Sequence, residues 1–212
     1  MNRHASFFHA PLFKAALLTA ITLPLTTACG DDDDGGSDSL SGVFVSAEHT
    51  ISLDGCDSPV SVSELGDGER FYVDLPETDY MFLSTESFFG QSAKTLSPCE
   101  GLDPCPEPES DDDFNIGASF FERDGDAWFT EGIAAGGSGQ NCTVTKTVMR
   151  LEPYTVGEGD DAQSGIRVTR TVSLKSLTTE DTDACLDLVD NPPEDLACDS
   201  VETLTAMRPA AE

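Results

Sequence analysis

After residue 42, apolar and polar residues alternate with a period of two, and this pattern constrains the fold more than any other feature of the chain. Segments such as "GVFVSAE" and "AWFTEGIAA" place successive side chains on opposite faces of an extended strand. In "RFYVDL" the alternation sets Phe71, Val73 and Leu75 on one face, and strand patterns continue in "YMFLSTESFFG" and "FNIGASFF". The sequence therefore predicts a mostly β domain.

The clearest pair of strands covers residues 142–152 and 165–176, joined by the Gly- and Asp-containing turn "GEGDDAQSG". One helix is predicted after it, with Thr178 as its N-cap and "NPP" as its stop, followed by a last strand, "VETLTAMR". Strands in consecutive hairpins favour an antiparallel β-barrel or a β-sandwich, and both remain open.

The element order, with a late helix before a final strand, resembles the lipocalin meander. The opening "LSGVF" also resembles the lipocalin start, with Gly42 in place and Phe44 where that family has Trp. The resemblance implies a barrel that encloses a small apolar ligand.

The first 28 residues have the composition of a signal peptide. Arg3 and Lys14 accompany an apolar run at residues 15–25, which ends in the small residues "TTA". The run is shorter than the roughly 20 apolar residues that a membrane-spanning helix needs. We therefore predict export from the cytoplasm.

Cys29 follows this junction directly. The stretch "LTTAC" resembles the lipobox of bacterial lipoproteins, with Thr26 where the family prefers Leu and Leu25 one position earlier. The resemblance implies that the Cys29 thiol receives a diacylglyceryl group and that cleavage makes Cys29 the first residue. A plain signal peptide with Cys29 as a seventh thiol is the alternative.

The domain organisation follows from this boundary: a signal peptide over residues 1–28, a lipidated cysteine with a flexible acidic tether over 29–39, and one β domain over 40–212. A lipobox, an acidic tether and a cysteine-rich β domain together resemble bacterial lipoproteins of the myxobacterial type. The predicted location is the bacterial cell envelope, outside the cytoplasm, with the inner and outer membranes both open.

Lipidation of Cys29 leaves an even number of cysteines, which suits disulfides in an oxidising compartment. The candidates are Cys56, Cys99, Cys105, Cys142, Cys185 and Cys198. One arrangement among those that six cysteines allow pairs Cys99 with Cys105, Cys185 with Cys198, and Cys56 with Cys142. We predict a disulfide-stapled domain.

The chain is strongly acidic, because 40 Asp and Glu against 11 Lys and Arg give a formal net charge of −29. Nucleic acids and anionic membrane surfaces repel such a chain, so no nucleic-acid partner is expected. Acidic runs at residues 111–113 and 160–161 offer oxygen ligands for a loose association with Ca²⁺, although neither has EF-hand spacing.

Catalytic and metal-binding motifs are missing from the sequence. Once the leader is removed, His49 is the only histidine, and we expect it in a turn near the first hairpin. A multi-histidine zinc site is therefore excluded, and neither a nucleophile elbow nor a phosphate-binding loop occurs. We predict no cofactor, no metal and no enzymatic activity.

Basic residues gather on the predicted long hairpin, which carries a candidate anion-binding strip: Lys146, Arg150, Arg167, Arg170 and Lys175. Whether they share one face depends on strand register, because a slip of one residue turns each side chain to the other face. The alternative is ordinary charge on a solvated sheet face.

The sequence thus predicts a membrane-anchored, non-enzymatic lipoprotein that binds a small apolar ligand or an envelope partner. Two alternatives remain: a structural surface protein without a ligand, and a hydrolase that uses two carboxylates about 5–10 Å apart.

Overall fold

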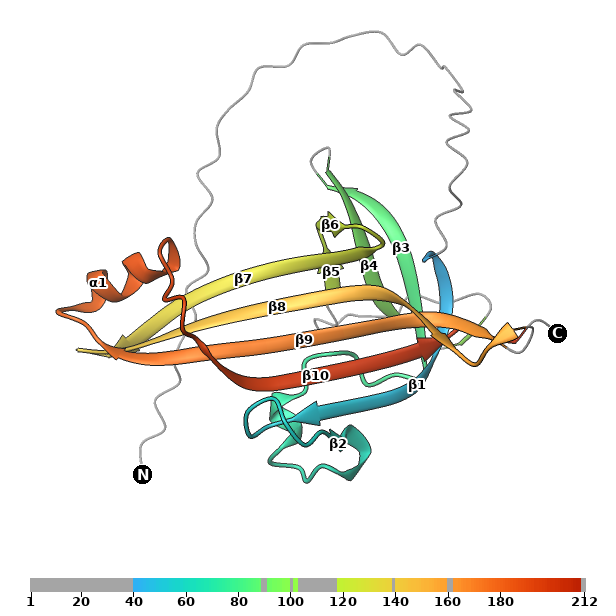
Figure 1. The fold of residues 1–212 in the computed structure, drawn as a ribbon, viewed down its shortest axis with the longest axis horizontal. Coiled ribbons are helices and arrows are strands. Elements are labelled where there is room, and N and C mark those ends of the chain that lie inside the picture. The colour runs from blue at the N-terminus through green and yellow to red at the C-terminus, as the bar shows by residue number, and fades with distance from the viewer. Residues whose placement is uncertain are drawn as a thin grey trace, which may run out of the picture. The chain divides into compact units, whose positions relative to one another are not determined.

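The computed structural model describes most of the chain after residue 39 (Figure 1). The described ranges are 40–88, 91–99, 101–102, 118–138, 140–159 and 162–210. All of them belong to one unit of the chain, residues 37–212. The predicted leader, the whole tether with Cys29, Cys105 and the acidic runs at 111–113 and 160–161 lie outside the described residues.

The described residues form ten strands, one α-helix and three short 3₁₀ turns. In chain order these are β1 (Gly42–Ser52), β2 (Val60–Ser61), η1 (Val62–Glu64), η2 (Arg70–Tyr72), β3 (Tyr80–Phe88), β4 (Gln91–Cys99), β5 (Ala118–Phe120), β6 (Glu122–Asp124), β7 (Ala127–Ser138), β8 (Asn141–Val156), β9 (Gln163–Thr178), α1 (Thr182–Leu186), η4 (Asp187–Val189) and β10 (Ala197–Met207). The predicted mostly β fold with one late helix and a final strand is confirmed.

All ten strands belong to one antiparallel sheet with the order β5-β4-β3-β1-β10-β9-β8-β7-β6, and β2 pairs beside β1. The predicted long hairpin is present as β8 and β9, which pair without a register shift from Asn141 opposite Thr178 to Val156 opposite Gln163. The sequence predicted this hairpin correctly because its alternation is regular on both sides of one turn.

The sheet is curved rather than closed. Its two edge strands, β5 and β6, are separated in the chain only by Phe121, whose backbone N–H donates to the carbonyl of Phe129 at 3.2 Å. In Figure 1, β3 and β4 cross behind the long strands β7 to β10 at a steep angle. Of the two architectures that the sequence left open, the sandwich-like one agrees with this arrangement.

The main core lies on the inner face of the curved sheet, where side chains of β1, β3, β4 and β5 meet those of β8, β9 and β10. Its buried members are Leu40, Phe44, Leu75, Met81, Leu83, Leu96, Phe120, Leu151, Ile166, Val168, Leu204 and Ala206. Burying each large side chain contributes about 1.5–3 kcal/mol, so this cluster is the main apolar contribution to stability.

A second, smaller cluster lies at the far end of the long strands. Cys142 and Val144 of β8 pack there with Cys185 of α1. Strand β8 has no register shift, so its even- and odd-numbered residues point to opposite faces of the sheet. Leu151 points to the main core, and Val144 therefore points to the other face. Helix α1 therefore covers the outer face of the sheet.

Three expectations about local structure were wrong. The segment "RFYVDL" is no strand, because residues 70–72 form the 3₁₀ turn η2 and Phe71 is 86% exposed. His49 lies in the middle of β1, paired with Leu204 of β10, instead of in a turn. The cap of α1 is also shifted from the predicted Thr178, since Asp181 accepts the hydrogen bond of the Ala184 amide at 2.9 Å.

Candidate functional site: a carboxylate-lined pocket beside an aromatic turn

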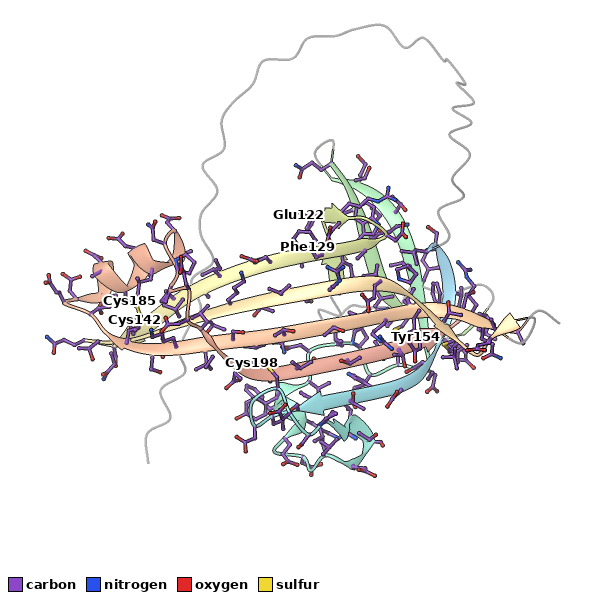
Figure 2. All side chains as sticks on the ribbon, in the orientation of Figure 1. Glu122, Phe129, Cys142, Tyr154, Cys185 and Cys198 are labelled. Atoms are coloured by element: carbon purple, nitrogen blue, oxygen red, sulfur yellow. A yellow bond between two sulfur atoms is a disulfide. The ribbon has the colours of Figure 1, made fainter. Side chains whose placement is uncertain are left out.

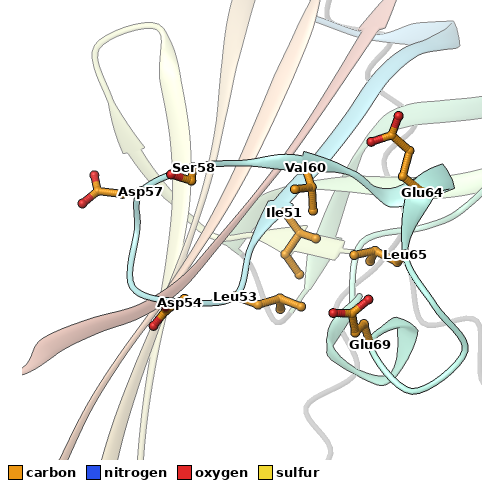
Figure 3. A pocket seen from close by; sticks show the side chains of 9 residues that line it. All are labelled: Ile51, Leu53, Asp54, Asp57, Ser58, Val60, Glu64, Leu65 and Glu69. Carbon is orange, nitrogen blue, oxygen red and sulfur yellow. The ribbon is translucent and has the colours of Figure 1, made fainter.

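A pocket of about 390 Å³ opens between the end of β1 and the segment that follows it (Figure 3). Its lining combines four apolar and four acidic side chains with one serine: Ile51, Leu53, Val60, Leu65, Asp54, Asp57, Glu64, Glu69 and Ser58. All of them come from the short stretch between residues 51 and 69, in which β1 turns back through β2 and η1.

The floor of the pocket is apolar. Ile51 of β1 is fully buried and pairs with Val60 of β2, whereas Leu53 and Leu65 are half-buried and Val60 is exposed. Figure 3 shows these four side chains pointing toward one another at the centre. The floor is therefore a small apolar surface that solvent reaches.

The rim of the pocket is acidic. Asp54, Asp57, Glu64 and Glu69 are all exposed, and none forms an ion pair with another described residue. Glu69 also accepts the backbone N–H of Gly66 at 3.1 Å, which fixes the turn that carries it. Four carboxylates without a cationic partner give the pocket a negative potential.

One wall of the pocket, residues 53–59, is covalently fixed to β10. Cys56 forms a disulfide with Cys198, with their Cα atoms 5.8 Å apart (Cys198 is labelled in Figure 2). The buried Ser52 hydroxyl donates to the carbonyls of Gly55, at 3.2 Å, and Asp57. This loop thus has a fixed position beside the end of β1.

The chain segment beyond the pocket and the turn after it is held by a buried carboxylate. The Glu202 side chain of β10 is fully buried, and its Oε1 accepts the Leu75 amide at 3.0 Å and lies 2.8 Å from His49 Nε2. Its Oε2 accepts the Asp74 amide at 3.1 Å and lies 3.8 Å from an Arg170 guanidinium nitrogen. We call this arrangement the Glu202 clamp.

In the Glu202 clamp, each oxygen of the buried Glu202 carboxylate accepts a hydrogen bond. A buried carboxylate is costly unless it is paired and hydrogen-bonded, and Arg170 with two backbone amides supplies both conditions. Arg170 also forms an ion pair with the Asp74 carboxylate. Asp74 is thus held twice, by its backbone amide through Glu202 and by its side chain through Arg170. The clamp ties the segment before β3 to the sheet.

An aromatic turn protrudes between the pocket and the Glu202 clamp. The turn is η2, and its Phe71 and Tyr72 are 86% and 56% exposed. Their rings meet edge to face with centroids 5.9 Å apart. Arg70 in the same turn pairs with Glu77 at 2.5 Å. Glu69, which lines the pocket, directly precedes the turn, so pocket and turn are neighbouring parts of one surface.

The predicted basic strip divides between two faces. The register places Lys146, Arg150, Arg167 and Lys175 on the outer face and Arg170 on the inner one, because Arg170 lies opposite Met149. The outer four pair with acids: Lys146 with Glu131 at 2.8 Å, Arg150 with Asp124 and Glu152 at 3.4 Å, Arg167 with Glu152 at 3.7 Å, and Lys175 with Asp195 at 2.6 Å. These pairs resemble ordinary surface charge more than an anion site.

The predicted disulfide partners are corrected by the structure. Cys198 pairs with Cys56 instead of Cys185, and Cys142 pairs with Cys185, with Cα atoms 5.6 Å apart (Figure 2). Sequence proximity favoured Cys185 with Cys198, but α1 packs on β8 instead. Cys99 is disulfide-bonded as well, and Cys105, the partner predicted for it, lies outside the described residues.

The disulfides place the domain in an oxidising, extracytoplasmic compartment, where such bonds persist. No helix in the described ranges has the length and hydropathy to span a membrane. Among the same residues, no three His, Cys, Asp or Glu side chains gather closely enough to hold a metal ion. Comparison with protein-family models, with curated proteins and with solved structures finds no match to this chain.

Proposed function

We propose that this protein is a non-enzymatic envelope lipoprotein, anchored through Cys29, whose β domain docks an envelope partner on the aromatic turn and the neighbouring pocket. The observation that carries the proposal is the exposure of Phe71 and Tyr72 on a turn whose two flanks are fixed. Exposed aromatic side chains are common at the centres of protein interfaces.

Fixed flanks favour binding. Residues 53–59 are held by the Cys56–Cys198 disulfide, and Asp74 and Leu75 are held by the Glu202 clamp. An interface that is already ordered loses less conformational entropy on association, so more of its contact energy appears as affinity. A mobile loop with the same two aromatic residues would bind more weakly.

A protein partner is better supported than a small apolar ligand inside the sheet. Phe44, Met81 and Phe120 are fully buried members of the main core. Their side chains occupy the interior space that a lipocalin-like ligand would need. Among the exposed apolar side chains, those of the aromatic turn lie directly beside the solvent-accessible pocket floor, so together they offer one apolar surface on the outside of the domain.

The anchor has a direct test. Replacing Cys29 with Ser should abolish labelling with radioactive palmitate and release the protein from membranes, because no other thiol follows the signal peptide directly. Continued acyl labelling of the Cys29→Ser variant would contradict the assignment.

The docking surface is tested by photo-crosslinking in living cells. p-Benzoylphenylalanine replaces Phe71 in one variant and Leu186 in a control, since Leu186 is a 51% exposed apolar residue on α1. We expect a discrete adduct from position 71 that position 186 does not give, and a lower yield when Tyr72→Ala is added. No adduct from position 71, or the same adducts from both positions, would overturn the proposal.

A further inference from the structure

We infer that the pocket beside the aromatic turn takes a lysine or arginine side chain of the docking partner, with the aliphatic stem on the floor and the cation at the rim. The inference rests on the proposed function, because it assigns the chemistry of the partner to the same surface. Its support comes from the shape, the apolar floor and the charge of the pocket.

The floor suits an aliphatic stem. Lysine and arginine cover apolar surface with their methylene groups and keep the charged end in water. Ile51, Leu53, Val60 and Leu65 offer such a surface in a space of about 390 Å³, large enough for one such side chain and part of its backbone. An acidic or strongly polar side chain would gain nothing from this floor.

The rim selects the charge. Figure 3 shows the Glu69 side chain beside Leu65, nearest the apolar centre, while Asp54, Asp57 and Glu64 lie farther out around it. A cation seated above the floor would have the Glu69 carboxylate beside it and further negative charge around it. An anion would be repelled by all of them.

The four rim carboxylates also differ from the other acids of the sheet. The cations of the long hairpin are engaged with Glu131, Asp124, Glu152 and Asp195, so these acids are already neutralised locally. The rim carboxylates form no ion pair within the described ranges. A binding protein that supplies a cation would therefore form a new ion pair there without breaking an existing one. The large excess of Asp and Glu over Lys and Arg in the chain steers a basic segment toward the protein.

Nuclear magnetic resonance titration of the lipidated mature chain in detergent micelles tests the inference. The probe is the peptide Ac-Gly-Tyr-Lys-Gly-NH₂, and the matched neutral probe carries Nε-acetyl-lysine, which keeps the stem and removes the charge. We expect the backbone amide signals of Leu53, Val60 and Leu65 to shift with the lysine peptide. The acetylated peptide should bind about tenfold more weakly.

Variants locate the charge that matters. The double variant Asp54→Asn with Glu69→Gln should weaken binding of the lysine peptide about tenfold, because two carboxylates each contribute modestly at a half-open site. Glutamine at position 69 can still accept the Gly66 amide, so the turn is kept. The control is Glu158→Gln with Asp190→Asn, which removes the same charge from two exposed positions outside the pocket.

Equal binding of the two peptides, or equal loss in the two double variants, would overturn the inference. The proposed function is tested separately by the adduct at position 71. An adduct at position 71 with no charge preference in the pocket would retain a docking surface and reject only the basic side chain. Absence of that adduct would reject the docking surface itself.

Discussion

Two segments that lie against the sheet, one at the far end of the long strands and one at the end of β1, are attached in different ways. At the far end, α1 is joined to β8 by Cys142–Cys185 and packs on an apolar cluster that includes Ile133, Leu177 and Leu188. At the end of β1, which we call the near end, the loop after β1 is joined to β10 by Cys56–Cys198, and the segment beyond it is held by the buried Glu202.

The two attachments differ in kind. Apolar contacts are non-directional, so they hold α1 against the sheet through several side chains at once. The Glu202 clamp is directional, because hydrogen bonds fix two backbone amides at set positions. Residues 74 and 75 are thus fixed in position, while the pocket is lined by the segment before them.

The largest expected effect comes from removing the Glu202 side chain. Glu202→Ala should lower the free energy of unfolding by about 3–5 kcal/mol, since it leaves Arg170 and two amides without their buried acceptor. Urea denaturation of this variant and of the control Glu158→Ala measures the effect. A loss below about 1 kcal/mol would show that the clamp contributes little.

The disulfides give the next largest effect and compare the two ends directly. Replacing either pair with serine should destabilise the domain by about 2–4 kcal/mol in the chain-entropy account. The loss should be larger for Cys56–Cys198, whose sequence separation is 142, than for Cys142–Cys185, whose separation is 43. Thermal unfolding of the two double variants tests this order, and the reverse order would contradict it.

The cap of α1 concerns the far end alone. Asp181→Ala removes the acceptor of the Ala184 amide and should cost about 1 kcal/mol, without changing the near end. Hydrogen exchange of α1 amides should become faster in this variant while that of Leu75 stays unchanged. Faster exchange at Leu75 would show that the two ends are coupled.

The smallest effect depends on pH. The hydrogen bond and charge of Lys175 lower the pKa of Asp195 below its ordinary value. A lowered carboxyl pKa stabilises the fold at neutral pH, and that contribution is lost as the pH falls through the lowered pKa. Because Asp195 is exposed, Asp195→Asn should flatten the acid side of the stability profile only slightly. A large change would mean that Asp195 has a further role.

The alternation of apolar and polar residues predicted a strand correctly where the apolar positions are also buried. The β8–β9 hairpin and the final strand were predicted correctly, since their apolar positions face a core in fixed register. "RFYVDL" has the same alternation, but Phe71 is exposed and only Leu75 reaches the core. The pattern of residue types alone does not show which apolar side chains pack against the core.

The Glu202 clamp and the disulfide pairs could not be derived from local sequence, because they join positions far apart in the chain. One signal was present: Glu202 alternates with Leu204 and Ala206 in "VETLTAMR", which places a charge on the core face. A charged residue in that position predicts a buried partner. The identity of that partner, Arg170 of β9, follows only from strand order.

The most direct test of the central claim, that a buried carboxylate fixes the aromatic surface, is hydrogen exchange at the amides of Asp74 and Leu75. In the unmodified protein both amides should exchange slowly, because Glu202 accepts them. Glu202→Gln keeps one acceptor oxygen, so it should accelerate exchange of at least one of the two amides about tenfold and leave the β8–β9 hairpin unchanged. Unprotected exchange of both amides in the unmodified protein would contradict the account.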